Sequence, residues 1–203
     1  MPYHYPKIEV IMASAMGYSH MRAVSREDSA QEYLRLVHES NAAQELSKRG
    51  QLDEAERRYR KLLVEKPAAG FDDVAVALTK HHLGEVLRRR GKLDEAEALL
   101  KEALAVRERH DRAAKIAVAL SDSNITRDEL AKVYEARGDC ALALATRVPG
   151  KRICGNGDCQ QLDYSELHAC SRCRCVFYCS KGCQRADWKA RHRAVCQPAD
   201  AAP

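Results

Sequence analysis

Hydrophobic and polar residues between positions 29 and 147 recur with the spacing of amphipathic helices, and alanine, leucine and charged residues dominate this segment. The preceding residues, 1–28, show no clean period of 2 or 3.6, so we expect a disordered leader there. We also expect a disordered tail over 197–203. The predicted helices cover residues 29–49, 53–65, 72–90, 94–109, 114–137 (with a candidate break near Ser121–Asn124) and 140–147.

An internal repeat underlies these helices. The sequence GQLDEAE at 50–56 returns as GKLDEAE at 91–97, 41 residues later, and a weaker copy, GDCALA, stands at 138–143. Repeats of this period indicate a solenoid of helix–turn–helix units. The glycine that opens each copy stands where the first helix of a unit must end, because glycine enters the left-handed conformation at low cost. Three small residues would let the helices of a unit approach closely: Ala55, Ala96 and Ala143.

The positions that flank these copies resemble a known repeat family. Segment 29–147 is similar to the tetratricopeptide repeat, in the longer-period form found in kinesin light chains. The resemblance implies a mostly α fold, a short α-solenoid of helix-turn-helix repeats, and the alternative is a generic helical bundle with coincidental turns. The residues that carry the resemblance are Leu83, Gly84, Leu87, Ala96 and Ala103 in the second unit, Tyr59 and Pro67 in the first, and Leu130 and Tyr134 in the third.

The third unit ends near Arg147 and lacks a full second helix, so one apolar edge of the solenoid needs cover. The C-terminal segment follows after a short linker, residues 148–151. We therefore expect that segment to cover the edge.

Composition narrows the class of protein. Aromatic residues make up only 5% of the chain, and just two residues are Phe, which argues against a β-sandwich core. No apolar run approaches the ~20 residues that a membrane-spanning helix needs. The N-terminus also has no apolar run followed by the small-residue cleavage site of a secretory signal. We expect a soluble, intracellular protein of the cytoplasm or nucleus, with no membrane partner.

Cysteine and histidine spacing in the last third of the chain predicts two zinc ions. Eight of the nine cysteines fall between positions 154 and 196. In a reducing compartment such a cluster indicates metal ligation, and a disulfide scaffold is the alternative. The pattern C-x4-C, C-x2-C, C-x3-C, H-x3-C supplies ligands for two closed tetrahedral sites, but spacing alone leaves open which four residues share an ion. The ligands are Cys154, Cys159, Cys170, Cys173, Cys179, Cys183, His192 and Cys196.

Three segments in this region resemble a second family: FYCS at 177–180, CQRADW at 183–188, and His192 with Cys196. They look like the MYND-type zinc finger, and we place this domain at 152–196. The resemblance implies a cross-braced finger with two structural zinc ions. The ligand sets that it implies are Cys154, Cys159, Cys179 and Cys183 for zinc 1, and Cys170, Cys173, His192 and Cys196 for zinc 2.

The same resemblance implies a binding function, since MYND fingers bind short proline-containing peptides, often of PxLxP type. Ser171, Gln184 and Trp188 match the positions that line the peptide groove. Trp188 could instead pack the small core between the zinc ions. Three further residues are expected to take no part in zinc binding: Cys140, His168 and Cys175.

Two binding modules without a recognisable catalytic grouping predict an adaptor, not an enzyme, for proteins bearing proline-rich short motifs, with the repeats as a second binding surface. The first alternative is a finger that acts as a structural zinc cap on a repeat scaffold. An enzyme alternative is a methyltransferase that pairs the finger with a SET domain, but no segment resembles the SET core. A nucleic-acid-associated regulator is a further alternative. The net charge of +5 would favour it, yet seven thiolates and two zinc ions lower that charge to about +2, so we do not expect direct nucleic-acid binding.

Overall fold

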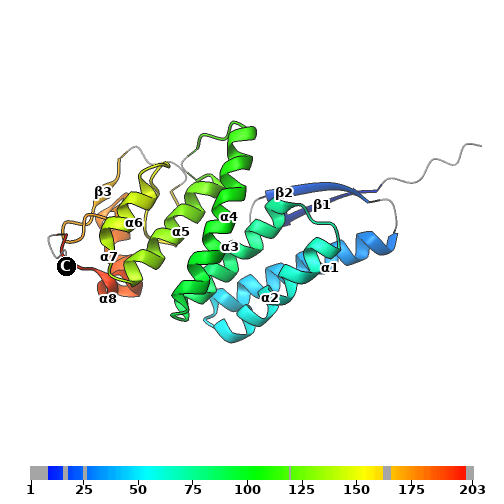
Figure 1. Ribbon diagram of the computed structural model, residues 1–203, viewed down its shortest axis with the longest axis horizontal. Coiled ribbons are helices and arrows are strands. Elements are labelled where there is room, and N and C mark those ends of the chain that lie inside the picture. Colours follow the sequence, from blue (N-terminus) through cyan, green and yellow to red (C-terminus); the bar gives the residue numbers. More distant parts are fainter. Residues whose placement is uncertain (1–8, 16–17, 25–26, 119, 162–165, 200–203) are drawn as a thin grey trace, which may run out of the picture. The chain divides into compact units, whose positions relative to one another are not determined.

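The computed structural model describes residues 9–15, 18–24, 27–118, 120–161 and 166–199, and helices dominate it (Figure 1). The chain divides into two compact units, Met1–Val86 and Leu87–Pro203. The mostly α fold class is confirmed. The helices that precede the cysteine-rich region are α1 (Glu27–Lys48), α2 (Leu52–Ala68), α3 (Asp73–Arg89), α4 (Leu93–Ala113), α5 (Asp122–Ala136) and α6 (Cys140–Arg147).

The fifth predicted helix is corrected, because α5 begins at Asp122 and not at residue 114. Lys115 adopts a left-handed conformation with φ of 55°, and the N–H of Ile116 donates to the carbonyl of Asp111 at 2.8 Å, which closes the end of α4. The hydroxyl of Ser121 then caps α5 by accepting from the N–H of Asn124 at 3.4 Å. The predicted gap at 110–113 is also wrong, because α4 continues to Ala113. The actual gap between the two helices ends at Ser121, where the sequence suggested a break.

The turns inside the repeat units share one geometry. Gly50, Gly91 and Gly138 have φ values of 79°, 77° and 82°. In each turn the N–H of the residue after the glycine donates at 2.9 Å to a carbonyl five residues earlier, which is the Schellman arrangement. The predicted role of the three glycines is therefore confirmed. The repeat is structural as well as sequential, since the same local interaction ends the first helix of each unit.

Small residues and leucines fill the spaces between neighbouring helices. Helix α1 packs on α2. Helix α4 packs on α5, and α5 packs on α6, so α4, α5 and α6 lie side by side in Figure 1. Ala55, Ala96 and Ala143 are each 0% exposed. They lie where a larger side chain would push the helices apart, as expected from their positions in the repeat. Two large side chains that the repeat resemblance named, Tyr59 and Leu87, are also buried.

The structure differs from the predicted disordered leader between residues 9 and 24. Strand β1 (Glu9–Ala15) pairs antiparallel with β2 (Tyr18–Val24), in the register Glu9 to Val24, and β1 lies against α1. A hairpin is held by main-chain hydrogen bonds, so it can form without a clean side-chain period of 2. Residues 1–8, which belong to the same prediction, lie outside the described residues.

The elements after the linker are short. They are β3 (His168–Ala169), β4 (Phe177–Tyr178), α7 (Lys181–Asp187), the π-helix η1 (Trp188–His192) and α8 (Arg193–Val195). The predicted disordered tail is corrected at its start, since the N–H of Ala199 donates to the carbonyl of Arg172 at 2.9 Å. Residues 200–203 lie outside the described part of the chain. No helix among the described residues is long and apolar enough to cross a membrane.

Replacing Gly91 by alanine should cost about 1 kcal/mol of stability, because alanine pays a steric penalty in the left-handed region. A Cβ atom at Gly91 would meet nothing within 4 Å, so the backbone conformation is the only source of the loss. Gly91→Asn should lose less, since asparagine enters this region more readily. Urea unfolding of the three proteins checks this, and equal stability of Gly91→Ala and the parent would contradict the left-handed turn.

Candidate metal centre

The structure gathers the eight predicted ligands into two groups of four. One group holds Cys154, Cys159, Cys179 and Cys183, and the other holds Cys170, Cys173, His192 and Cys196, with the ligand atoms of each group all within 4.8 Å of one another. Neighbouring donors lie 3.5 to 3.9 Å apart, for example 3.6 Å between the Sγ atoms of Cys159 and Cys179. A tetrahedral zinc ion with bonds of about 2.3 Å holds its sulfur atoms about 3.8 Å apart. Both groups therefore fit zinc.

The grouping is the cross-braced one that the resemblance implied. The sequential alternative would need Cys154 and Cys159 to meet Cys170 and Cys173, and these two pairs fall in different groups. The strand pair β3–β4 explains the result. His168 pairs with Tyr178 and Ala169 with Phe177, so the chain reverses between the two strands and carries the following residue, Cys179, towards the first pair.

The first group is positioned by a glycine turn and by a helix cap. The N–H of Gly155 donates to the carbonyl of Phe177 at 2.8 Å, and a Cβ atom on Gly155 would lie 2.5 Å from a methyl carbon of Val176. Only glycine allows this close approach of the two segments. The hydroxyl of Ser180 caps α7 by accepting from the N–H of Cys183 at 3.1 Å, which places Cys183 one helical turn after Cys179.

The second group combines a tight turn with one turn of helix. Cys170 and Cys173 flank a turn in which the N–H of Arg174 donates to the carbonyl of Cys170 at 2.9 Å, with Arg174 in the left-handed region at φ of 57°. His192 and Cys196 are four residues apart, and the N–H of Cys196 donates to the carbonyl of His192 at 2.9 Å. All four ligands of this group are buried.

A bound cation would also offset the cost of ionising the buried thiols. Burial raises the pKa of the Cys154 and Cys196 thiols above the ordinary value, so both would stay protonated without a nearby positive ion. Cys183 shows the opposite shift, since the hydrogen bond from Asn156 lowers its pKa to about 7. Four soft donors surround each centre, which suits zinc. Neither set leaves an open coordination position, so the two zinc ions have a structural role.

Three residues set aside by the sequence analysis have distinct places. His168 is exposed and lies in β3, where it pairs with Tyr178. Cys175 belongs to neither group of four, and its side chain is 1% exposed. The structure adds one feature that spacing does not predict: Cys140, at the start of α6, lies with Cys173 and Cys175 in a cluster whose Sγ atoms are within 4.8 Å of one another.

A buried network of charged residues joins the last repeat to the finger, and sequence reasoning missed it. Arg147, at the end of α6, is 4% exposed and donates to Asp128 Oδ1 at 2.7 Å, to Glu135, and to the carbonyl of Cys175 at 2.7 Å. Arg191 of the finger also donates to Glu135. Burial alone would raise the pKa of Glu135, but the positive charges of Arg147 and Arg191 lower it overall.

This network shows how the finger meets the open end of the repeats. An apolar edge was expected at this contact, but the hydrogen bonds and ion pairs across it join guanidinium groups to carboxylates and to a carbonyl. The only available sequence signal was the presence of arginine and acidic residues on predicted helices, and such residues usually mark a solvated face. Their burial depends on the partner segment, 56 residues away in the case of Arg191 and Glu135.

The three predicted peptide-binding residues occupy two places in the finger. Gln184 lies in α7 and Trp188 begins η1, so the two half-buried side chains are four residues apart on continuous helical backbone and share a face. The Trp188 ring packs edge-on against the ring of His192, with centroids 5.8 Å apart. Ser171 is exposed in the turn between Cys170 and Cys173.

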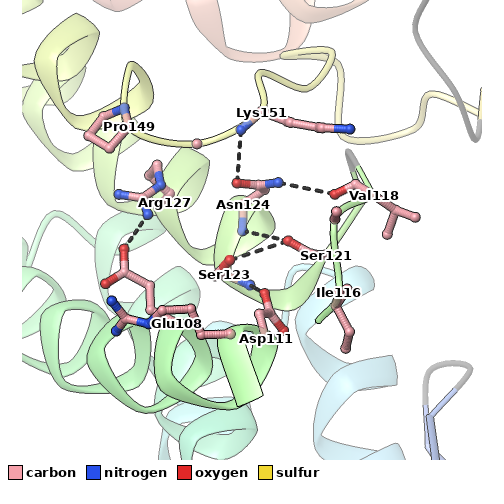
Figure 2. Close-up of a pocket in the computed structure, with 13 residues that line it drawn as sticks. Glu108, Asp111, Ile116, Val118, Ser121, Ser123, Asn124, Arg127, Pro149 and Lys151 are labelled. Carbon is pink, nitrogen blue, oxygen red and sulfur yellow. Dashed lines mark hydrogen bonds and ion pairs between the residues drawn. The ribbon is translucent and has the colours of Figure 1, made fainter. Parts of the chain in front are cut away.

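A pocket of about 370 Å³ opens at the N-terminal end of α5 (Figure 2). Its walls come from the end of α4, the segment between α4 and α5, the start of α5, and the linker residues 149–151. Lys151 donates through its backbone N–H to Asn124 Oδ1 at 3.1 Å, which attaches the linker to the wall. Ile116 and Val118 line the pocket and are 39% and 59% exposed, so apolar surface is available beside polar groups.

Comparison with known protein families assigns both parts of the chain. Residues 153–196 match the MYND finger, and residues 76–110 match a tetratricopeptide repeat. Both families are typically non-catalytic interaction modules. No solved structure matches the chain.

Among curated proteins, the chain is similar over short stretches to two F-box proteins and to ubiquitin carboxyl-terminal hydrolase 19, all from Arabidopsis thaliana. The identities are 43% over 53 residues, 41% over 51 and 36% over 45, which cover 25%, 24% and 22% of this chain. The matched stretches span only 16%, 14% and 7% of those relatives. These likenesses therefore do not extend to the relatives as whole proteins. Together with the two groups of four zinc donors, the family matches show that this chain carries tetratricopeptide-like repeats followed by a zinc-binding MYND finger.

Proposed function

We propose that this protein is an interaction adaptor whose finger binds short proline-containing peptides, of the PxLxP type, on partner proteins. Two matched interaction modules support a binding role. The single observation that carries the peptide proposal is the face formed by Gln184 and Trp188, with one polar and one aromatic side chain, four residues apart. Proline-rich segments are extended before they bind, and aromatic surfaces with an adjacent hydrogen-bonding group suit them.

The zinc ligands on either side of this face hold it rigid. Cys183, a ligand of the first group, directly precedes Gln184, and His192, a ligand of the second group, contacts the ring of Trp188. A surface fixed before binding loses little conformational entropy when a peptide docks. Structural zinc would thus contribute to peptide affinity indirectly, by ordering the residues that touch the peptide.

Titration of a PxLxP peptide into the zinc-loaded full chain tests the proposal. Trp188 is the only tryptophan in the chain, so its fluorescence reports on this face directly. We expect a saturable change in emission. We expect Gln184→Ala to weaken binding about 5- to 150-fold, because the loss of one buried hydrogen bond costs about 1 to 3 kcal/mol.

Two controls sharpen this experiment. A peptide with both prolines replaced by alanine should bind more weakly, and Lys181→Gln, which changes an exposed residue at the start of the same helix, should leave affinity unchanged. If the folded, zinc-loaded protein gives no response, the peptide-reading function is wrong.

A second candidate role for the finger is that of a structural cap on the repeats. The observation that favours it is the buried contact of Arg147 and Glu135 with the finger. In that case partner binding would fall to the repeats, where the pocket with exposed Ile116 and Val118 offers a second surface. The cap and the peptide reader are compatible roles, since Gln184 and Trp188 take no part in the network.

A further inference from the structure

The orientation of His192 in the second zinc group leaves one ring nitrogen directed at the repeats. Its Nε2 lies 3.5 Å from Cys173 Sγ, which makes Nε2 the atom that faces the metal position. Its Nδ1 lies 3.7 Å from Glu135 Oε2, and the ring is 1% exposed. Nδ1 is buried and has no hydrogen-bond partner among the described residues, although a buried N–H needs one.

Glu135 is a carboxylate from outside the finger. It lies in the last turn of α5, and it is 1% exposed. Arg147 donates to its Oε1 and Arg191 to its Oε2, so two guanidinium groups fix the plane of the carboxylate. An ionised carboxylate oxygen accepts two hydrogen bonds, and Oε2 therefore keeps capacity for the imidazole N–H.

We propose that Glu135 is the outer-sphere carboxylate of the second zinc site, which accepts a hydrogen bond from Nδ1–H of His192 when Nε2 binds zinc. Zinc-bound histidines nearly always donate their second N–H to a carboxylate, carbonyl or water, which sets the tautomer and raises the basicity of the ligand. Here α5, the first helix of the third repeat unit, would supply that group, so the site is complete only when the finger packs on α5.

The two zinc groups differ in the source of their second-sphere contact. The first group, with Cys154 and Cys183, receives its second-sphere hydrogen bond from within the finger, through Asn156 Nδ2 and Cys183 Sγ at 3.5 Å. Among the described residues, the second group alone faces a carboxylate of the repeats in this way. Zinc affinity at the second site and packing of the finger on α5 should therefore be reciprocally coupled, whereas the first site serves as an internal reference. The inference does not depend on peptide binding.

Cobalt(II) titration of the full chain tests the proposal. Cobalt at a four-sulfur site and at a three-sulfur, one-nitrogen site absorbs differently, so both affinities can be followed in one protein. Glu135→Gln keeps the shape of the side chain but lacks the charge. We expect it to weaken cobalt binding at the second site by about 10- to 100-fold and to leave the first site unchanged.

Glu129→Gln is the matched control. Glu129 is a buried carboxylate on the same helix, and it pairs with Arg88 and Lys132. It should change neither affinity. Equal affinities in Glu135→Gln and the parent, or equal losses at both sites, would overturn the proposal, because equal losses indicate general destabilisation.

A measurement on the unmodified protein covers the case in which Glu135→Gln does not fold. Nitrogen-15 NMR of the zinc-loaded protein should show a proton on His192 Nδ1 that exchanges slowly with water, because it is buried and hydrogen-bonded. A rapidly exchanging proton at this atom would overturn the assignment.

Discussion

Cys170→Ala is expected to leave the protein with one bound zinc ion where the parent binds two, whereas Cys175→Ala should retain both. The two cysteines are five residues apart, and their side chains are 2% and 1% exposed, so each substitution removes a similar buried sulfur atom. Only Cys170 belongs to a group of four donors. A structural zinc site that loses one of four ligands binds the ion far more weakly, and binding of structural zinc contributes about 10 to 16 kcal/mol in isolated zinc-finger peptides.

Zinc content measured by elemental analysis, together with circular dichroism, checks this result. Cys170→Ala should also lose order in the finger, and a strong chelator should have a similar effect on the parent at both sites. Cys175→Ala is the control for sulfur removal alone. Two zinc ions retained in Cys170→Ala, or one lost in Cys175→Ala, would show that the ligand sets are wrong.

Arg147→Met is expected to destabilise the zinc-loaded protein by about 3 to 5 kcal/mol. Methionine has a similar length, but it leaves the carboxylates of Asp128 and Glu135, which are 4% and 1% exposed, without the guanidinium between them. Arg147 is a leading cause of the lowered pKa of both carboxyl groups. Removing one partner from a buried ionic network is this costly because each carboxylate stays buried with one cation fewer: Asp128 keeps Lys132, and Glu135 keeps Arg191.

Urea unfolding at fixed zinc concentration measures the loss, and Arg137→Met provides the comparison. Arg137 also pairs with two acidic residues, Asp94 and Glu97, but its side chain is 31% exposed, and Asp94 is fully exposed. Surface pairs of this kind contribute about 1 kcal/mol or less. If the two variants lost equal stability, the contact between α6 and the finger would not be the buried network that we describe.

Local chemistry explains why so much of this protein was predictable from its sequence. Gly50, Gly91 and Gly138 could be assigned to turns because a left-handed residue is a property of one position and its neighbours. The zinc ligands were likewise recognisable as close pairs, such as Cys170 with Cys173, because two donors a few residues apart can reach one ion. The strand pair formed by residues 9–15 and 18–24 was missed, since main-chain pairing leaves no required side-chain pattern.

The α4–α5 boundary illustrates an intermediate case. The sequence predicted a gap between the two helices at 110–113 and a candidate break near Ser121–Asn124. The structure instead continues α4 to Ala113, ends it through the left-handed Lys115 and begins α5 at Asp122. Asp111 then accepts a hydrogen bond from the N–H of Ser123 at 3.1 Å, which ties the two helices together across the gap. A lysine in the left-handed region has no strong sequence signature, because this conformation is uncommon for residues other than glycine.

The sequence by itself determined the repeat period, the identity of the eight zinc donors and the closed character of both sites, since each depends on residue type and short spacing. Only the tertiary structure decided that Glu135 and Arg147 are buried against the finger and that Glu135 faces His192. A charged residue on a helix looks the same in sequence whether water or a distant segment covers it. Its energy depends on the partner that arrives through folding, and here that partner is up to 56 residues away.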